Sequence, residues 1–457
     1  MIGRLTVLAV VAVAVTASVP AYGQYPARRT AMPTPPAGVS PASYAAGAWA
    51  NPSNTGPVMG EQMLSRDKGW DYEDTQLDFL LQRLTRNTWI RLDYRLWDAS
   101  RPGDHLLGAN ILGVANERLP FNVYPEGGGA AIGTATVPAI DAVSLKNVNG
   151  MRATLGIALA GGSLEADIWG TKENEYEFSV PNLGPQDFGP SEGGALPPPP
   201  VFAATSTMVN GELGNNQFLY DHSFHVRYVQ DLWGTGINYI ADDAQEGEGL
   251  KILPMIGFRY FEMNEGMFQT GIFDGGFDGD VDFPGEDFNG NGQLDPGEDL
   301  NGDGVLEPGM PALISVINST VNNEVFAPQF GLRFQLQHRW FTLGFEPKVA
   351  VGVNAYQMHV STNRLRSHDD PYTSQSRRGA RLAQVGDFRF YVKLNPSENI
   401  QLFCSYDIMV AGGVSRAHDN VYYNDNGQSE PPAIGVEPGF EVLWWQGLTV
   451  GGQIWLR

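Results

Sequence analysis

Cysteine is almost missing from this 457-residue sequence, in which Cys404 is the only one. A single cysteine excludes a disulfide framework within one chain and any metal site built from several thiolates. Beyond the N-terminus the sequence also has no apolar run of the roughly 18 residues that a membrane-spanning helix needs. A helical membrane protein is therefore excluded. A β-barrel is not, because its alternating strands give only a weak hydropathy signal.

Charge is scarce and one-sided. Charged residues make up 18% of the chain, against about 25% in ordinary soluble domains. The net charge of −22 makes nucleic acid and anionic lipid headgroups poor partners. The sequence has no G-x-S-x-G elbow, P-loop or H-E-x-x-H motif. His222 and His225, three residues apart, would lie on opposite faces of a strand, so they predict no joint metal site. We therefore expect no enzymatic activity.

The N-terminus has the features of an export signal. Arg4 is followed by the apolar run LTVLAVVAVAVTASV and then by the small-x-small triplet Ala21-Tyr22-Gly23. A charged start, a short apolar stretch and a small-residue cleavage site are typical of a secretory signal peptide. We predict a signal peptide over 1–23, cleaved between Gly23 and Gln24, with an uncleaved anchor as the alternative. Residues 24–86 include a stretch rich in Pro, Ala and Gly, and we predict a flexible N-terminal segment there.

Period-2 alternation begins at residue 88 and recurs to the end of the chain. The segment TWIRLDYRLW (88–97) places Leu92 and Tyr94 on one face, and Arg91 and Asp93 on the other. Successive side chains of a strand point to opposite faces, so this pattern predicts a strand with one apolar and one charged face. About twelve such strands are predicted, over 88–97, 151–161, 164–170, 224–230, 233–241, 252–262, 330–337, 341–356, 388–395, 400–408, 440–445 and 448–456.

Short and long connections alternate between these segments. The short ones are expected near 160–163, 229–233, 337–341, 394–399 and 445–447, and the long ones at 98–150, 173–217, 263–324, 360–386 and 411–436. Outer-membrane barrels have tight turns at one end and long loops at the other, and about 9–11 tilted residues cross the bilayer. We predict an all-β fold over 87–457: a single antiparallel transmembrane-type β-barrel of about 12 strands (range 10 to 14) with long external loops. Tryptophans near strand ends are expected at the membrane interface: Trp89, Trp97, Trp169, Trp233, Trp340, Trp444 and Trp455.

The charged faces are expected to line the lumen of this barrel. Opposite charges across a water-filled lumen create a transverse field and set ion preference. Alternatively, the charges pair and plug a narrow barrel, and the sequence does not decide between these two states. Asp407 and Glu441 lie on the same faces. The predicted lumen-facing residues are Arg91, Asp93, Arg95, Glu165, Asp167, Arg227, Arg259, Arg333, Glu346, Lys348, Arg389 and Lys393.

An acidic insert at 274–310 holds eleven acids and no base. Its core, DFNGNGQLDPGE, has the spacing of a twelve-residue calcium loop, with Gly292 at the sharp turn and Glu298 as the bidentate ligand. A second unit follows, but Met310 replaces its twelfth-position acid. We expect structural Ca²⁺ here, with a solvated acidic loop as the alternative. The predicted metal ligands are Asp287, Asn289, Asn291, Gln293, Asp295 and Glu298 in the first unit, and Asp299, Asn301, Asp303, Val305 and Glu307 in the second.

Several segments together resemble a known family. NTWIRLDYRLWDAS, NGMRATLGIALAGGSLEADIWG, PMIGFRYFEMNEGMF, FGLRFQLQHRWFTLGFEPKVAVG and EVLWWQGLTVGGQIWLR occur in the order seen in the outer-membrane β-barrel porin family of planctomycetes. The likeness spans about residues 87–457. It implies an exported, porin-like barrel and supplies no catalytic residues. The calcium-like insert at 274–310 departs from the family pattern.

The predicted function is that of an outer-membrane β-barrel, a porin-like passive pore for small polar solutes with a calcium-stabilised surface loop. Its expected partners are outer-membrane lipid and small polar solutes or ions, and the sequence does not give its oligomeric state. Two alternatives stay open. One is a plugged structural or adhesive surface barrel, and the other is a soluble secreted calcium-binding β protein.

Overall fold

The computed structural model describes residues 87–456 except 115, 117, 125–130, 185–199, 243–248, 274–311, 398 and 426–433. All of them belong to the unit Thr85–Arg457. The predicted signal peptide (1–23), N-terminal segment (24–86) and acidic insert (274–310) lie outside the described residues. The helices in the described part of the chain are two short 3₁₀ turns, η1 (Ile140–Ala142) and η2 (His418–Asn420). None is long and apolar enough to cross a membrane.

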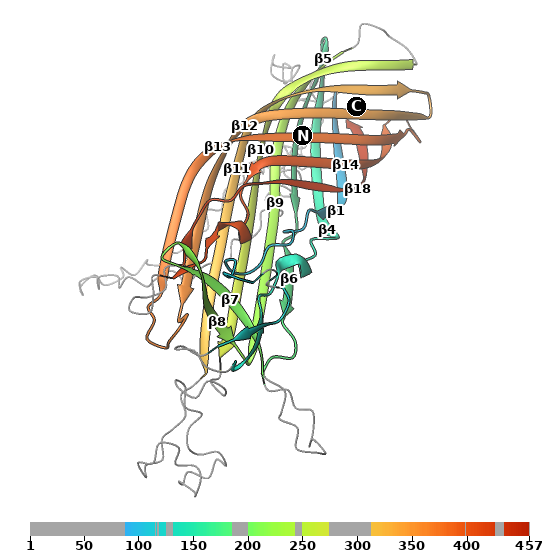
Figure 1. Ribbon diagram of the computed structural model, residues 1–457. Coiled ribbons are helices and arrows are strands. Elements are labelled where there is room, and N and C mark those ends of the chain that lie inside the picture. The colour runs from blue at the N-terminus through green and yellow to red at the C-terminus, as the bar shows by residue number, and fades with distance from the viewer. Residues whose placement is uncertain are drawn as a thin grey trace, which may run out of the picture. The chain divides into compact units, whose positions relative to one another are not determined.

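Ten strands form a closed antiparallel ring (Figure 1). Each ring strand pairs with the next one along the chain, and the last pairs with the first: Thr88 lies opposite Leu456 and Trp97 opposite Gly447. Closure leaves no open edge along these paired stretches, and it confirms the predicted all-β barrel. The ring strands are β1 (Thr88–Ala99), β4 (Val148–Leu159), β5 (Gly162–Thr171), β9 (Ser223–Ala241), β10 (Gly249–Phe273), β11 (Leu313–Gln337), β12 (Phe341–Asn363), β13 (Thr373–Leu394), β14 (Ile400–Val414) and β18 (Glu441–Leu456).

The ring has ten strands because two predicted turns do not exist. Residues 229–233 continue β9, where Asp231 pairs with Asn264. Residues 445–447 continue β18. A Cβ at Gly447 would lie 2.0 Å from the carbonyl oxygen of Leu96, so this glycine permits close strand approach and does not mark a turn. Ten lies within the predicted range of strand numbers.

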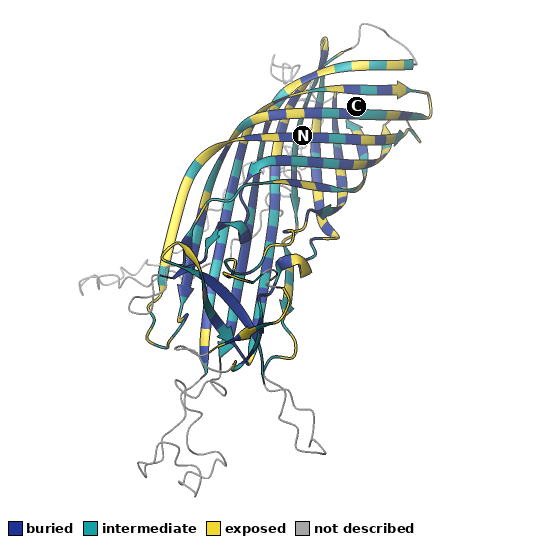
Figure 2. Ribbon diagram, in the orientation of Figure 1, coloured by how far each residue is buried: buried dark blue, intermediate teal, exposed yellow. Residues whose placement is uncertain are grey.

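Several strands are longer than one bilayer crossing requires. β10 and β11 have 25 residues each, and β12 and β13 have 23 and 22. The described ends of the predicted loop 263–324 and most of the predicted loop 360–386 are therefore strand. The outward face of β11 is apolar from Phe326 to Leu336, an 11-residue stretch. Beyond it, toward the long connections, the same face turns polar with Asn322 and Glu324. The apolar stretch matches the about 9–11 residues of a membrane-crossing strand. The alternation of exposed and buried residues along the ring is visible in Figure 2.

The described residues of the connections 100–147, 172–222 and 415–440 fold into a cap at one end of the ring, which we call the loop cap. Its residues Leu107, Ile140 and Leu145 join one buried apolar cluster with Tyr228 of β9 and Met263 of β10. An apolar core therefore fills this end of the barrel. The smaller elements here are β2 (Phe121–Val123), β3 (Gly133–Thr136), β6 (Asn174–Ser179), β7 (Val201–Val209), β8 (Glu212–Tyr220), β15 (Val421–Tyr422), β16 (Asn424–Asp425) and β17 (Gly435–Val436).

The tryptophans divide between the two faces of the ring. Trp340 is 60% exposed and Trp444 is 42% exposed, as an interface position requires. Trp89, Trp97 and Trp169 are buried on the inner face, so their prediction as interface residues is wrong. They lie on the charged side of their strands, where arginines stack on their rings.

Candidate functional site

Fourteen ionisable side chains gather on the inner face of the ring, and we call them the lumen cluster. They come from eight ring strands, β1, β4, β5 and β10 to β14, and alternate residues of each strand point inward. All but Asp167 and Lys393 are buried. Eight are basic and six are acidic: Arg91, Arg95, Arg152, Arg259, Arg333, Lys348, Arg389 and Lys393; Asp93, Glu165, Asp167, Glu346, Asp387 and Asp407.

Arg333 of β11 joins two other strands. Its Nη1 and Nη2 donate to Oε1 and Oε2 of Glu165 on β5 at 2.8 and 2.7 Å. Its Nε donates to Oε2 of Glu346 on the neighbouring β12 at 2.6 Å. β5 and β11 are not neighbours in the ring, so the bidentate pair spans part of the lumen. The fork geometry of guanidinium fits two carboxylates at once.

The network continues around the inner wall. Lys348 Nζ lies 3.1 Å from Glu346 Oε1 and 3.6 Å from Asp387 Oδ2. Arg259 of β10 forms an ion pair with Asp387 of β13 across the lumen. Arg389 donates from Nε to Oδ1 of Asp407 at 3.0 Å. Opposite charges are thus held in one connected chain, as burial of charge requires.

Arg95 is a poorly satisfied cation of the lumen cluster. Its Nε and Nη1 have no hydrogen-bond partner among the described residues. Its nearest carboxylate oxygen in an ion pair is Oδ2 of Asp407, 3.9 Å from Nη2. The guanidinium carbon stands 4.4 Å from the ring centre of Trp97 and 5.2 Å from that of Trp169. A cavity of about 10 Å³ borders Arg95, enough for about one water.

Eleven of the twelve predicted lumen residues lie in this cluster, and Arg227 does not. Val226 and Tyr228 of β9 are fully buried in the apolar core, so Arg227 between them faces outward. There it forms ion pairs with Glu175 and Glu177 of β6. The alternation predicted the strand correctly but assigned its faces the wrong way round. Here the apolar face contacts the loop cap, whereas along β1 the apolar face is exposed on the outside of the ring.

Three members of the cluster are not in the predicted list: Asp407, which the alternation places on the same faces, and Arg152 and Asp387. Arg152 lies on the charged face of β4, opposite to the face of Met151. Its Nε donates to Oδ2 of Asp93 at 2.8 Å. Asp387 precedes the segment predicted as a strand, 388–395. Its position two residues before Arg389 is the signal that would have placed both on one face.

A buried ion pair fastens the loop cap to the barrel. Arg416 follows β14 and is fully buried. Its Nη2 donates to Oε1 of Glu265 on β10 at 2.9 Å and to the hydroxyl of Tyr228 at 3.2 Å. Glu265 Oε2 also accepts the backbone N–H of Ala417 at 3.3 Å. The segment after β14 is therefore held against the inner wall.

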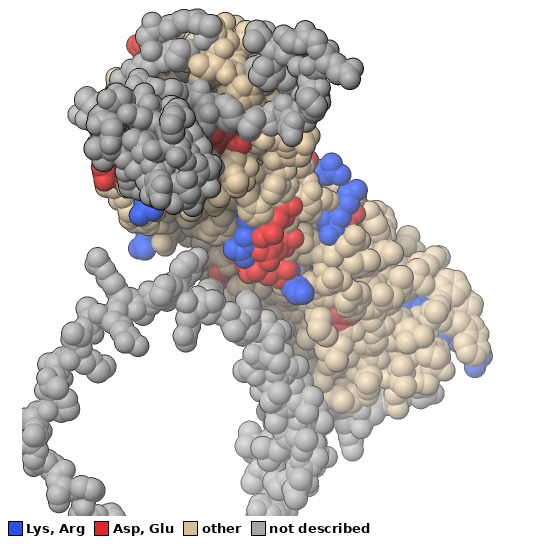
Figure 3. All heavy atoms as spheres, turned by 90° about the horizontal axis from the view of Figure 1, so that it is seen from below, with Lys and Arg blue, Asp and Glu red and all other residues tan. Residues whose placement is uncertain are grey.

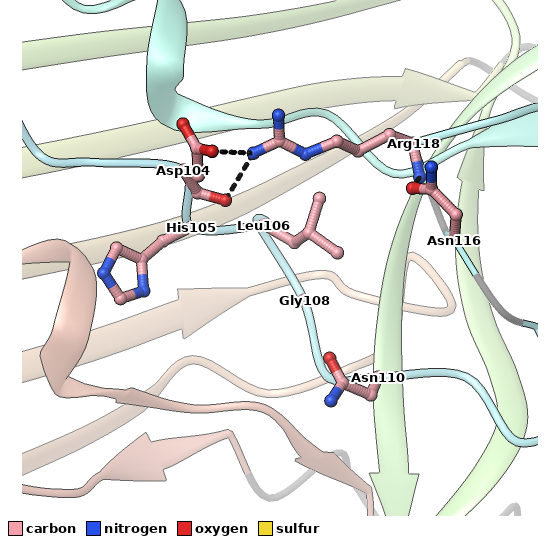
Figure 4. Close-up of a pocket in the computed structure, with 7 residues that line it drawn as sticks. All are labelled: Asp104, His105, Leu106, Gly108, Asn110, Asn116 and Arg118. Carbon is pink, nitrogen blue, oxygen red and sulfur yellow. Dashed lines mark hydrogen bonds and ion pairs between the residues drawn. The ribbon is translucent and has the colours of Figure 1, made fainter.

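Next to this pair, His105, His418 and Glu441 meet. His105 Nε2 lies 3.1 Å from Glu441 Oε1, and this hydrogen bond raises the pKa of His105. Burial lowers the pKa of His418. His105 also borders an open cleft of about 490 Å³ in the loop cap, which Asp104, Asn116 and Arg118 line as well (Figure 4). Seen from the loop-cap end, the surface shows acidic side chains gathered beside basic ones (Figure 3).

One family model matches part of the chain, and it describes the family "Putative beta barrel porin-7", over residues 305–455. No curated protein matches. The match covers the described strands β11 to β18, together with Arg333, Glu346, Lys348 and Arg389 of the lumen cluster. A third of the chain thus matches a β-barrel porin family.

Several solved structures resemble the chain weakly. A deltaS2S3 mutant of the monoaromatic hydrocarbon channel TodX has a TM-score of 0.21 at 7% identity, covering 82% of this chain and 92% of its own. The toluene transporter TbuX of Ralstonia pickettii has 0.17 at 8%, covering 81% and 90%. An anion-selective porin from Comamonas acidovorans has 0.13 at 8%, covering 80% and 98%. Scores this low carry no functional argument.

Proposed function

We propose that this protein is an outer-membrane β-barrel that passes small ions and small polar solutes through a narrow, charged lumen. The observation that carries the proposal is the reversal of polarity between the two faces of the ring. An apolar stretch of membrane-crossing length lies outside, and fourteen ionisable side chains lie inside. A barrel with lipid outside and paired or hydrated charges inside makes this arrangement favourable on both faces.

The outward face supports the membrane assignment. Phe330 is 60% exposed, Val351 48% and Leu448 54%, each on a different ring strand. Soluble monomers rarely expose contiguous apolar patches beyond a few hundred Å², and here the exposed apolar residues recur on strand after strand. In a bilayer, the same surface is covered by acyl chains. This argues against the soluble secreted alternative.

The lumen cluster supports a narrow passage with a preference for anions. Eight basic against six acidic groups leave an excess of positive charge along the wall, although the whole chain carries −22. Fixed charges that line a constriction repel ions of like sign and concentrate ions of opposite sign. The ion pairs across the lumen narrow the route, so the conductance should be small.

The plugged structural barrel is the second candidate. The observation that favours it is the small size of the cavity beside Arg95, about 10 Å³, together with the apolar core under the loop cap. The side chains buried around Arg95 and those in the apolar core would then stabilise the fold and leave no route for solute. The acidic insert 274–310 fits either candidate. We propose structural Ca²⁺ there, on the spacing of Asp287, Asp295 and Glu298.

Recording in planar lipid bilayers tests the proposal. Purified protein in detergent is added to one chamber, and reversal potentials are measured in a KCl gradient. Discrete small conductance steps with a reversal potential on the chloride side are expected. Electrophoresis of boiled and unboiled samples serves as the folding control, because closed barrels resist SDS until heated. A heat-modifiable protein that never conducts would overturn the pore and select the plugged barrel.

A further inference from the structure

Three segments far apart in the sequence bring nitrogen and oxygen donors together at the mouth of the barrel. His105 belongs to the connection between β1 and β4, His418 to η2, and Glu441 begins β18. One ligand atom from each lies within 4.8 Å of the others. A ligand bound by all three side chains would link two parts of the loop cap to a ring strand.

His418 is the informative member of the trio. Its side chain is 1% exposed. Its Nδ1 has no hydrogen-bond partner among the described residues, and its Nε2 lies 3.5 Å from Glu441 Oε1, at the limit of a hydrogen bond. Burying an imidazole ring whose nitrogens have so few hydrogen-bond partners costs free energy, unless a ligand binds to those nitrogens. Because burial favours the neutral ring, His418 is able to offer a lone pair.

The spacing of the donors suits a small cation. Glu441 Oε1 is 3.1 Å from His105 Nε2 and 3.5 Å from His418 Nε2. Ligand atoms about 2.0–2.2 Å from a tetrahedral ion are separated from one another by about 3.3 Å. We propose that His105, His418 and Glu441 form a site for a divalent transition-metal ion of the zinc class. Two imidazoles and one carboxylate favour such an ion over Ca²⁺ or Mg²⁺, which prefer oxygen ligands.

The surrounding charges are compatible with a cation. Arg416 Nη1 lies 3.8 Å from Glu441 Oε2, but Arg416 is already paired with Glu265 at 2.9 Å. Its positive charge is therefore largely compensated. Asp419 follows His418 directly in the chain and adds negative charge on the same turn.

The site is open on one side. His105 borders the cleft of about 490 Å³, and its side chain is 47% exposed. Figure 4 shows its ring on the opposite side of the chain from Arg118 and Asn116. Three protein ligands with an accessible fourth position are typical of zinc sites that keep a water. Metal would enter at the exposed side of the His105 ring and would fasten the β1–β4 connection to the start of β18.

The test titrates full-length protein in detergent with Zn²⁺ by calorimetry, and with Co²⁺ by visible absorption. We expect one site that wild type and His338→Gln share, because His338 is an exposed histidine distant in sequence from the trio. His105→Gln and Glu441→Gln should each weaken binding at least tenfold and abolish the Co²⁺ bands typical of tetrahedral nitrogen and oxygen ligation. Because His105 is half exposed, its variant should fold, and its heat-dependent gel mobility checks this.

Two results would overturn the site. One is wild-type protein that shows no Zn²⁺ binding beyond that of His105→Gln, which would assign any remaining binding to other groups such as the acidic insert. The other is folded Glu441→Gln with unchanged affinity. In either case the trio is a hydrogen-bonded contact that needs no metal.

Discussion

Arg333 and Glu165 form a bidentate ion pair inside the barrel, with both N–O distances below 3 Å. The two residues are 168 positions apart in the sequence and lie on strands that are not neighbours in the ring. The contact therefore depends on the curvature that the sheet takes from β5 through β9 and β10 to β11. A sheet that opened between β9 and β10 would separate them.

Removing Arg333 should destabilise the protein more than removing Glu165. Arg333→Gln leaves Glu165 without its ion-pair partner, whereas Glu165→Gln leaves Arg333 paired with Glu346. Breaking a buried pair from one side costs about 3–5 kcal/mol. We expect a cost in that range for Arg333→Gln and a smaller one for Glu165→Gln, in urea unfolding from detergent micelles. Arg227→Gln, in an exposed pair, should change the stability by about 1 kcal/mol at most. Equal costs at all three positions would contradict the network.

Charge reversal at Lys393 should change the ion preference of the lumen. Lys393 is only partly buried and has no salt bridge with a described residue. Lys393→Glu lowers the charge of the lumen cluster by two, so it removes the excess of eight basic over six acidic groups. We expect the reversal potential in a KCl gradient to move toward zero. Arg227→Glu makes the same change on the outer face and should leave the potential unchanged. An equal shift in both variants would mean that the lumen does not set selectivity.

Gly344 gives Tyr391 its place on the inner wall. A Cβ at Gly344 would lie 2.1 Å from Cζ of Tyr391. The Tyr391 ring crosses this glycine, and its hydroxyl accepts a hydrogen bond of 2.6 Å from Gln335. Gly344→Ala should lower the free energy of unfolding by about 1–3 kcal/mol through overpacking. The matched control is Gly170→Ala on β5, where the nearest atom to a new Cβ is 3.6 Å away. Comparable losses of unfolding free energy in Gly344→Ala and Gly170→Ala would show that Gly344 is not needed to make room for the Tyr391 ring.

The barrel itself could be predicted from the sequence because its signal is local. Alternation within ten residues gives a strand and two faces, as in β1, where Arg91 and Asp93 are buried and Leu92 and Tyr94 are exposed. Such a pattern needs no knowledge of the partner strand. It therefore predicts eleven members of the lumen cluster without knowledge of the strand pairing.

The loop cap could not be predicted in the same way. An apolar face has the same sequence pattern whether it contacts lipid or a core of loop residues. The pattern therefore predicts Arg227 as inward, although its neighbours Val226 and Tyr228 are the buried residues. The same ambiguity hid the trio of His105, His418 and Glu441, whose members approach only through tertiary folding. Strand continuity across 229–233 is a further case, because pairing of Asp231 with Asn264 overrides a local turn pattern.

Heat-dependent gel mobility should report ring closure directly. The β1–β18 ladder extends from the pair Thr88–Leu456 to the pair Ala99–Trp445. Gly451 lies against β1 so closely that a Cβ would be 2.3 Å from the carbonyl oxygen of Leu92. Gly451→Val should weaken closure and lower the temperature at which unboiled protein loses its faster mobility in SDS. Gly170→Ala again serves as the control. An unchanged transition in Gly451→Val would mean that this seam does not limit SDS resistance.

Calcium should bind the acidic insert if its spacing has been interpreted correctly. Asp287 and Glu298 take the first and twelfth positions of the first unit, and the twelfth supplies two oxygens. We expect calorimetry of the full-length protein to detect binding in the range of extracellular modules, about 10⁻⁴–10⁻³ M. Glu298→Gln should weaken it at least tenfold. Asp274→Asn removes one charge from the same insert but lies outside the twelve-residue unit, so it should have little effect. Equal losses in both variants would point to diffuse attraction by eleven acids, and no binding at millimolar Ca²⁺ would refute the site.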